Sequence, residues 1–330
     1  MSDRSGPRPA VPHEAASPTP SQRSPWLCAS VVWALIGAVG VGLQVWVFVR
    51  WAADGNLHAY PSGGYTIPTA LKVATRVTEG VLLGALALGI WWCRRHCRAA
   101  GRVTLPAALL AGCCLSFWLD GYLNAADHTI GHNRYGLNVL SWGPYLPGWT
   151  GPQAGVETEI ESLLTLGAYA ALILWIFMGV AVAARLRRWR PHWSRARIAA
   201  GTAAACLALD IPMEQAYQRV GGYGYVYALP RLTLFEGHYY QLPLSSPVSM
   251  ILLVVMPVVL MTLYARPGRD IWIFEGSLRL PRRAQGCVRL LAGVGYMTVA
   301  VTAALLFITA AALAIGHPVD FPSWFSPPAT

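Results

Sequence analysis

The sequence predicts an all-α, polytopic transmembrane bundle of about seven spans, and three observations support this fold class. Hydrophobic residues make up 55% of the 330-residue chain and charged residues only 12%, about half the charged share of a typical soluble domain. The apolar residues form runs long enough to cross a bilayer. The basic residues form short clusters between those runs, which is typical of membrane orientation signals. The net charge of +10 therefore predicts no nucleic-acid partner, because it forms no single soluble patch.

The first predicted span covers residues 26–49, which are too long for a signal-peptide core and lack a convincing cleavage site. Six further apolar runs lie at about 70–93, 103–124, 160–184, 196–216, 247–265 and 288–315. Residues 1–25 contain six prolines and no apolar periodicity, so we expect a disordered cytoplasmic tail. The predicted organisation is this tail, one transmembrane domain over 26–316 and a C-terminal tail over 317–330.

Arginine placement predicts the orientation of these spans. The segments 94–102, 185–197 and 266–289 contain four, six and six arginines, whereas the opposite connections contain Arg50, Arg134, Arg219 and Arg231 only. Because basic connections stay in the cytoplasm, the N-terminus is expected inside and the C-terminus outside. The expected location is the cytoplasmic membrane of a bacterium, with the lipid bilayer as a partner. No sequence pattern indicates an oligomeric state.

Acidic residues gather toward the predicted outer ends of three spans. Asp120, Asn124 and Asp127 are spaced i, i+4, i+7, so they share one face if the third span continues that far. The i, i+4 spacing recurs in two more pairs, which are Glu157 with Glu161 at the start of the fourth span and Asp210 with Glu214 at the end of the fifth. Neighbouring carboxylates hold their pKa values apart, which lets one act as an acid and another as a base.

Each carboxylate also has a purely structural interpretation. Asp127, Glu157 and Glu161 suit solvated or dipole-stabilising positions near helix ends. The embedded residues Asp120, Asp210 and Glu214 would serve as interhelical clamps if they paired with Lys72, Arg76 or Arg219. A carboxylate at membrane depth is costly, however, so we favour a functional role for the embedded three.

Two long connections, at about 125–158 and 217–246, lie on the predicted outer side and are rich in glycine and aromatic residues. Long structured loops over a helical bundle often form lids or pocket walls. His128, His132 and His238 lie in these connections and suit either acid–base groups or ordinary polar loop positions. No standard metal-binding spacing occurs, so no metal ligands are predicted.

These loops carry a family resemblance. From Asp120 the sequence reads DGYLNAADHTIGHNRYGLNVLSWGPYLPGW, which resembles the AveC-like spirocyclase family, named for a membrane protein of avermectin biosynthesis. The family's motif elements fall on Gln44, Val45, Asp120, His128, Asn133, Asn138, Ser141, Trp142, Pro147, Gly148, Trp149, Glu161, Asp210, Glu214, Tyr239, Pro243 and Leu244. The resemblance spans most of residues 26–265. Four positions depart from the family pattern: Asp127 replaces Asn, Tyr240 replaces His, and Ser245 and Ser246 replace His and Glu.

The resemblance implies a cofactor-free cyclase that closes an apolar dihydroxy-ketone polyketide into a spiroketal, in some members with dehydration. A protonated carboxylic acid would activate the ketone and the departing water, while a carboxylate accepts protons from the attacking hydroxyls. The implied catalytic residues are Asp120, Asp210 and Glu214, with Glu161 and His128 assisting. The implied substrate-binding residues are Asn124, Asp127, Asn133, Asn138, Trp142, Trp149, Tyr239 and His238. Because of the four departures, the resemblance does not extend to a shared substrate.

Two other functions fit the same residues. An isoprenoid cyclase or transferase would use the acidic pairs, with Mg²⁺ if its substrate is a diphosphate. A non-enzymatic small-molecule transporter would more often show inverted repeats and interrupted helices, and the sequence shows neither.

Overall fold

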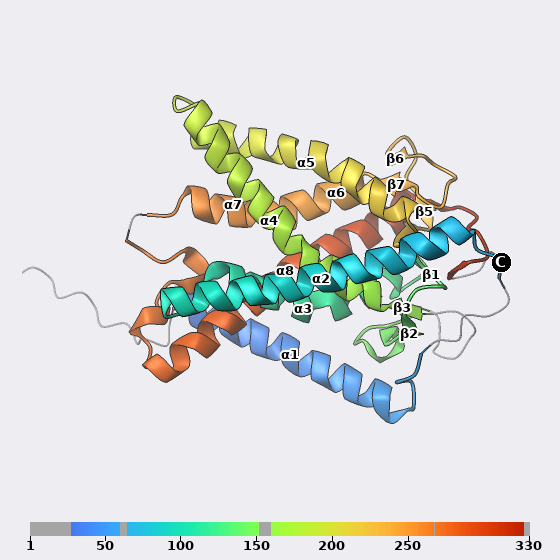
Figure 1. Ribbon diagram of the computed structural model, residues 1–330, viewed down its shortest axis with the longest axis horizontal. Helices are drawn as coiled ribbons and strands as arrows, with labels where there is room; N and C mark the ends of the chain where they lie inside the picture. Colours follow the sequence, from blue (N-terminus) through green and yellow to red (C-terminus); the bar gives the residue numbers. More distant parts are fainter. Residues whose placement is uncertain (1–27, 60–64, 152–159, 267, 327–330) are drawn as a thin grey trace, which may run out of the picture.

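The computed structural model describes residues 28–59, 65–151, 160–266 and 268–326. The predicted tail at 1–25 and residue Glu157 lie outside the described residues. The described chain is mostly helical, which confirms the predicted class, and its helices run roughly side by side along the long axis of the molecule (Figure 1). The helices are α1 (Ala29–Ala53), α2 (Thr69–Ala100), α3 (Leu105–Ser116), α4 (Leu163–Trp189), α5 (Arg195–Arg219), α6 (Ser245–Ser249), α7 (Met256–Leu263) and α8 (Arg282–Ile315).

Seven helical segments of the described chain are long and apolar enough to cross a membrane. Five of them are α1, α2, α4, α5 and α8. The third segment joins α3 to the 3₁₀ helix η1 (Phe117–Asn124), and the sixth joins α6 and α7 through the π-helical turn η3 (Met250–Val255). Each segment overlaps one predicted run, so hydropathy alone located all seven.

The bundle is covered at one end by the connections at 125–151 and 220–244 and by residues 317–326; we call this the capped end. These connections pair into short strands, which the sequence did not predict. The strands are β1 (Ile130–Asn133), β2 (Asn138–Leu140), β3 (Ile160–Ser162), β4 (Tyr223–Tyr225), β5 (Tyr227–Ala228), β6 (Thr233–Leu234), β7 (Leu242–Pro243), β8 (His317–Pro318) and β9 (Phe325–Ser326). The N–H and C=O groups of a buried loop need hydrogen-bond partners, and short strand pairs between loops provide them.

β1 is the centre of this cap. It pairs antiparallel with β4, with Ile130 opposite Tyr225, and with β9, with Asn133 opposite Phe325. The chain after Gly316 therefore returns over the bundle and contributes two strands to the cap. Trp324 and Phe325 stack on each other with ring centroids 4.5 Å apart. Figure 1 shows the labelled strands β1, β2, β3, β5, β6 and β7 together at one end of the bundle.

Two local predictions about the carboxylates are wrong. The third span tightens into η1 at Phe117 and ends at Asn124, so Asp127 lies beyond it and shares no helical face with Asp120. Glu161 lies in strand β3, paired opposite Val139 of β2, and not in the first turn of a helix. The third span ends before Asp127, and α4 begins after Glu161. In both places the backbone belongs to the loops and strands of the cap instead of a helix.

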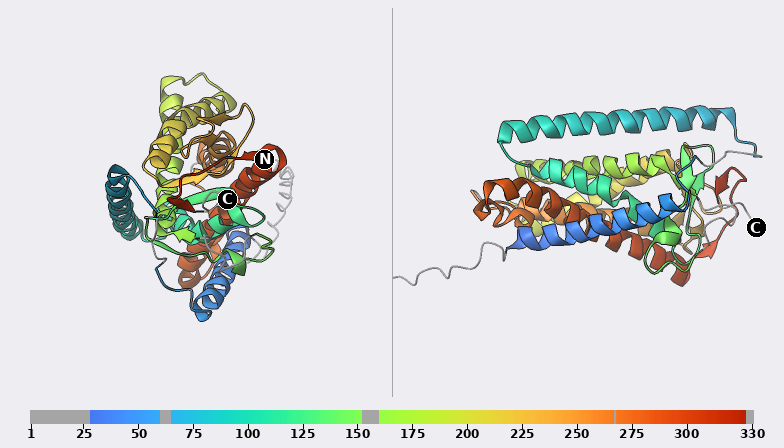
Figure 2. Two further views of the ribbon diagram at one scale, coloured as in Figure 1. Left: turned by 90° about the vertical axis from the view of Figure 1, so that its right-hand side faces the viewer. Right: turned by 90° about the horizontal axis from the view of Figure 1, so that it is seen from below.

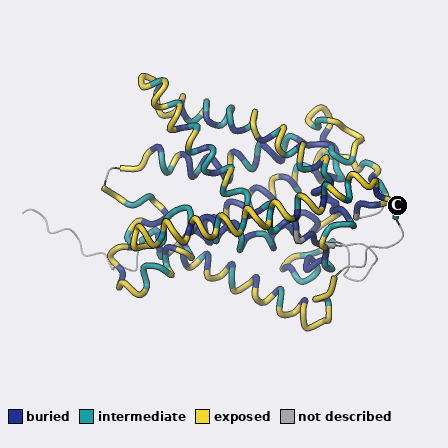
Figure 3. The backbone as a smooth tube through the Cα atoms, in the orientation of Figure 1, coloured by how far each residue is buried: buried dark blue, intermediate teal, exposed yellow. Residues whose placement is uncertain are grey.

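Glycine contacts hold α8 against α1 and α3. A Cβ on Gly295 of α8 would lie 2.0 Å from the Trp33 carbonyl oxygen, and a Cβ on Gly293 would lie 2.5 Å from the Ala108 carbonyl carbon. Such close approach of backbones is a common way to associate membrane helices. Helix α2 packs differently: both views in Figure 2 show it set apart along one side, and Figure 3 shows it mostly exposed.

Candidate functional site

A cavity of about 450 Å³ lies between the helices beneath the cap. Helices α2, α4, α5 and α8 and the turn η3 supply most of the apolar wall, while η1, β1, β4, α4, α5 and α6 supply most of the polar groups. The polar and titratable residues in the lining are Thr78, Asp120, His132, Thr165, Tyr169, Trp175, Asp210, Glu214, Tyr217, Tyr223, Tyr225 and Ser246. Its lining in the described chain includes no lysine or arginine. The site therefore combines an apolar chamber with a few convergent polar side chains, as small-molecule sites commonly do.

Helix α5 brings two of the predicted carboxylates to this cavity. Asp210 and Glu214 are one turn apart, and both line it. Pro212 lies between them inside the helix, where its missing N–H removes a donor for the carbonyl of Ala208. The Trp175 indole N–H donates to Asp210 Oδ1 from α4. The predicted i, i+4 pair on α5 is thus present and directed toward a cavity.

Three hydroxyl groups surround the carboxylate of Glu214. Oε1 of Glu214 accepts hydrogen bonds from Tyr223 at 2.6 Å, from Tyr225 at 3.0 Å and from Ser246 at 2.9 Å. The Tyr225 hydroxyl also lies 2.6 Å from the Ser246 hydroxyl. Burial, together with the nearby Glu214 carboxylate, raises the pKa of both Tyr223 and Tyr225 well above the usual value. These hydroxyls consequently remain donors, which stabilise negative charge on Glu214.

Asp120 faces the cavity from a different side. Its Oδ1 accepts a hydrogen bond from the Tyr169 hydroxyl at 2.9 Å, and its Oδ2 lies 3.9 Å from His132 Nε2. Burial lowers the pKa of His132 to about 4, so the imidazole is neutral at pH 7. Glu161 is also buried near this group, and its Oε1 accepts a hydrogen bond from Ser141 Oγ at 2.9 Å. Asp120, His132 and Glu161 each place one possible ligand atom within 4.8 Å of the others.

The three candidate clamp cations have other partners. Arg76 pairs with Glu79 at 2.6 Å, Arg219 lies over the ring of Tyr240, and Lys72 lies over the ring of Tyr135. None of these contacts involves Asp120, Asp210 or Glu214. The clamp interpretation therefore finds no support among the described residues.

The predicted asparagines serve the cap. Asn124 accepts the backbone N–H groups of Thr129 and Ile130 and donates to the Ile130 carbonyl. Asn133 donates to Thr75 Oγ1 of α2 at 2.9 Å, and Asn138 donates to the Asn133 carbonyl at 2.9 Å. All three are buried, yet none lines the cavity. They hold the loop that positions His132.

The predicted aromatic residues also lie outside the cavity lining. Trp142 is buried against Phe48 and donates its indole N–H to the Trp118 carbonyl at 2.8 Å. A Cβ on Gly143 would lie 2.4 Å from the Trp149 ring, so Trp149 packs on the backbone of that glycine. Tyr239 donates to the Arg219 carbonyl at 3.1 Å and packs against Trp324. These side chains build the cap.

Three further predicted residues lie on the rim of the cap. Asp127 is exposed and accepts a hydrogen bond from the Tyr227 hydroxyl at 2.6 Å, which raises the pKa of Tyr227 to about 12. The backbone N–H of His128 donates to Asp127 at 2.7 Å. His238 is exposed and lies beside Tyr240, with ring centroids 4.9 Å apart. The structure does not bring these three side chains to the carboxylates.

Sequence reasoning missed several cavity residues. It weighed His132 as an acid–base group without choosing it, and it assigned no role to Tyr169, Trp175, Tyr223, Tyr225 or Ser246. A signal existed for two of them, because Tyr223 and Tyr225 alternate across Gly224 and so point to one face of a strand. Tyr169 and Trp175 lie six residues apart in the apolar helix α4, and no sequence pattern distinguished them from the other residues of that helix.

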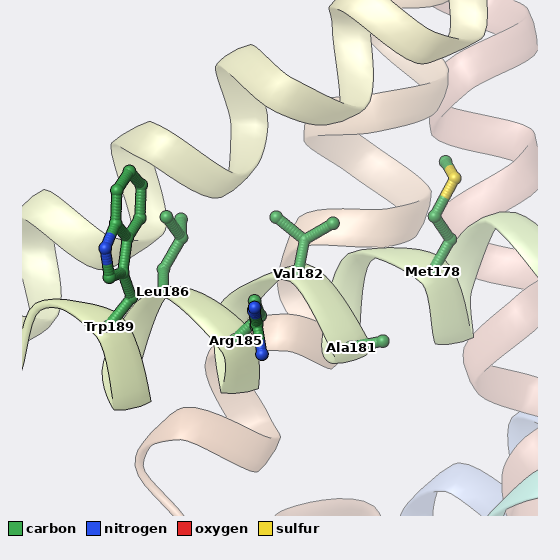
Figure 4. A pocket seen from close by; sticks show the side chains of 6 residues that line it. All are labelled: Met178, Ala181, Val182, Arg185, Leu186 and Trp189. Atoms are coloured by element: carbon green, nitrogen blue, oxygen red, sulfur yellow. The ribbon is translucent and has the colours of Figure 1, made fainter.

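A second hollow lies far from the cap, on the surface beside α4. Figure 4 shows Met178, Val182, Leu186 and Trp189 projecting from one side of this helix. Arg185 is the one charged residue in its lining among the described residues. It therefore offers no convergent set of acid–base groups, and the cavity beneath the cap is the better candidate.

Comparison with known proteins places the chain in a family. It matches no curated protein and no solved structure. Residues 100–330 match the family model described as spirocyclase AveC-like, and these residues include the cap and most of the cavity wall. The family name denotes a cyclase of natural-product biosynthesis. Because the match covers more than half of the chain, this protein belongs to the AveC-like spirocyclase family.

Proposed function

We propose that this protein is a membrane-embedded, bacterial cyclase that forms a spiroketal in a polyketide-type natural product. The observation that carries the proposal is the apolar cavity of about 450 Å³ into which Asp120, Asp210 and Glu214 all project. An apolar chain folded around a ketone matches such walls, and the carboxylates supply the proton transfers that ring closure requires.

The reaction has two closures. One hydroxyl of the substrate adds to the ketone carbon and loses its proton, while the ketone oxygen gains a proton, which gives a cyclic hemiketal. The hemiketal hydroxyl then gains a proton and leaves as water, which gives an oxocarbenium ion. The second hydroxyl attacks that carbon and loses its proton, so the product is a spiroketal and one water is released. Each step needs a proton donor or acceptor held close to the reacting oxygen.

The contacts of the α5 pair favour one division of these tasks. Glu214 accepts three hydroxyl hydrogen bonds on a single oxygen, which stabilises its ionised form, so we assign it the role of base. Asp210 is one turn away and receives the Trp175 indole N–H. With an ionised carboxylate beside it, Asp210 is better suited to hold a proton, and we assign it the role of acid.

The remaining polar groups orient and stabilise the reacting chain. Asp120 and His132 line the wall contributed by η1 and β1, and we assign them to binding of the ketone oxygen. The ring of Tyr169 and the indole of Trp175 line the same space. Aromatic faces and a carboxylate stabilise an oxocarbenium ion electrostatically.

An apolar substrate could enter from the bilayer. Met213 lines the cavity and is also 47% exposed on the surface of α5. The cavity wall thus reaches the outside of the bundle between apolar helices. This route resolves a conflict, since charge bias predicts the capped end outside the cell whereas polyketides are made in the cytoplasm.

The described lining contains no lysine or arginine, so a diphosphate substrate would depend on a metal ion alone for its cationic partner. An isoprenoid reaction without a metal ion in this cavity would start by protonation.

Metabolite profiling of the producing strain tests the proposal. The wild-type strain is compared with strains that carry Asp210→Asn or the rim variant Asp127→Asn as a control. We expect Asp210→Asn to accumulate an open-chain or hemiketal precursor, or an epimeric mixture from spontaneous closure, while the control keeps the normal profile. A linear terpenoid that accumulates instead would indicate isoprenoid cyclisation. An unchanged profile with intact Asp210→Asn protein would contradict catalysis by these carboxylates.

A further inference from the structure

Asp120 and His132, which the proposed function uses only to bind the ketone, form a compact group with Glu161 that has the composition of a metal site. The three residues come from three separate elements, η1, β1 and β3. Each is at most 7% exposed, and one oxygen or nitrogen of each lies within 4.8 Å of the others. Because the three side chains come from three elements, the fold brings them together. The spacing of these residues in the sequence does not predict the group.

The gap between His132 and Asp120 has room for an ion. His132 is 3% exposed, and its Nε2 lies 3.9 Å from Asp120 Oδ2, a gap wider than a hydrogen bond. A cation about 2.1 Å from each atom would fit the gap between Nε2 and Oδ2.

The carboxylates of the group are oriented by outer partners. The Tyr169 hydroxyl donates to Oδ1 of Asp120 at 2.9 Å and leaves Oδ2 directed at His132. Ser141 donates to Oε1 of Glu161 at 2.9 Å, and Ser141 is itself fixed by the backbone N–H of Gly143 at 2.9 Å. Hydrogen bonds of this kind fix the orientation of metal ligands in proteins.

Charge balance points in the same direction. When both carboxylates are ionised, a divalent cation bound between them would cancel their charge. Two carboxylates with one histidine is a mixed oxygen and nitrogen set, which suits Zn²⁺, Mn²⁺, Fe²⁺ or Co²⁺.

We propose that Asp120, His132 and Glu161 form a binding site for one divalent transition-metal ion in the wall of the cavity. Because Asp120 and His132 also line the cavity, an ion held there would be accessible to a ketone oxygen and could act as a Lewis acid on it. Metal binding itself does not depend on the proposed cyclase reaction, whereas this Lewis-acid role rests on it.

Metal binding to the purified full-length protein in detergent tests the site. The protein is treated with EDTA, dialysed, and titrated with Zn²⁺, Mn²⁺ or Co²⁺, and bound metal is measured by mass spectrometry after desalting. We expect about one equivalent per chain and a rise in the melting temperature on binding. His132→Ala and Glu161→Gln should each weaken binding by roughly tenfold to a hundredfold or more.

Matched controls separate loss of the site from loss of the fold. His128→Ala removes a histidine four residues away, on the rim of the cap, and should bind metal as the wild type does. The melting temperature of metal-free His132→Ala should stay near that of the metal-free wild type, while its rise on addition of metal is lost. A Co²⁺ absorption spectrum that changes in Glu161→Gln would assign that carboxylate to the ion.

The outcomes distinguish the two proposals. Asp210→Asn protein that binds metal normally but does not cyclise supports both. Metal binding without any cyclisation by the wild type would retain the site and contradict the cyclase function. The metal proposal is overturned if no stoichiometric metal is retained, or if His132→Ala and His128→Ala bind metal equally.

Discussion

The two sides of the bundle are built by different rules. On the side of α1, α3 and α8, glycines let helix backbones approach until a single Cβ would not fit, as at Gly295 and Gly293. On the side of α2, α4 and α5, a cavity separates the helices, and a close glycine contact there meets a side chain instead of backbone: a Cβ on Gly167 of α4 would lie 2.7 Å from Leu82 Cβ of α2. The most hydrophobic window of α2 is 11% buried, against 56% for the α3–η1 segment. Close packing on one side leaves the other side free to hold a chamber lined by acidic groups.

The largest expected effect is on the reaction rate, from a substitution in the cavity. Asp210→Asn should lower the rate of cyclisation by about 10²- to 10⁴-fold, because it removes an acid–base group and leaves the site otherwise intact. The amide oxygen can still accept the Trp175 indole N–H, so the melting temperature should change little. The rate is measured with purified protein by the appearance of spiroketal.

Asp127→Asn is the matched control for that variant, since Asp127 is exposed and lies outside the cavity lining. Its rate should equal that of the wild type. Equal losses in both variants would contradict the assignment of the cavity as the active site.

The next largest expected effect is on stability, from a substitution where α8 packs against α1 and α3. Gly295→Ala would place a Cβ 2.0 Å from the Trp33 carbonyl oxygen, so α1 and α8 must separate, at a cost of about 1–3 kcal/mol in the free energy of unfolding. Gly42→Ala, on α1 with nothing within 4 Å of its Cβ, should leave stability unchanged or raise it by about 1 kcal/mol. Thermal unfolding in detergent compares the two. A smaller shift in Gly295→Ala than in Gly42→Ala would show that the packed side tolerates a wider spacing.

A smaller effect on rate is expected from the hydroxyl groups around Glu214. Tyr225→Phe removes one donor to that carboxylate and one contact with Ser246. The loss of a hydrogen bond to a charged group costs about 1.5–3 kcal/mol, so the rate should fall by roughly tenfold to a hundredfold. Tyr227→Phe removes a hydroxyl of the same type that bonds Asp127 on the rim, and its rate should not change. A rate for Tyr225→Phe equal to that of Tyr227→Phe would argue against Glu214 as the base.

The smallest effect is expected at the surface of the cap. His238 is exposed beside Tyr240, and an exposed side chain of this kind contributes within about 0.5 kcal/mol. His238→Ala should therefore change the rate by about twofold at most. A loss of tenfold or more would mean that the substrate contacts the cap surface as well as the cavity.

The sequence predicts the bundle well and the site in part. Seven spans follow from hydropathy, and the three embedded carboxylates follow from the high cost of charge at membrane depth. The cap was missed because its strands are two to four residues long and pair segments far apart in the chain, as β1 does with β9. Periodicity in a short segment carries no information about such partners.

The same limit explains the misplaced binding residues. Asn133 and Trp142 belong to the motif that carries the family resemblance, and both are buried, but a motif does not say whether a residue binds substrate or holds a loop. His128 and His132 look alike in sequence. Only the position of His132 on β1, opposite Tyr223 of β4, brings it to the cavity.

The most direct test of the account is cyclisation by the purified protein. A synthetic dihydroxy ketone is incubated with wild-type protein, with Asp210→Asn or with buffer, and the products are resolved by chiral chromatography. We predict that the wild type yields one spiroketal stereoisomer faster than buffer does, while Asp210→Asn yields the slow epimeric mixture of spontaneous closure. Wild-type and Asp210→Asn reactions with the same rate and the same isomer ratio would contradict a catalytic role for the cavity carboxylates.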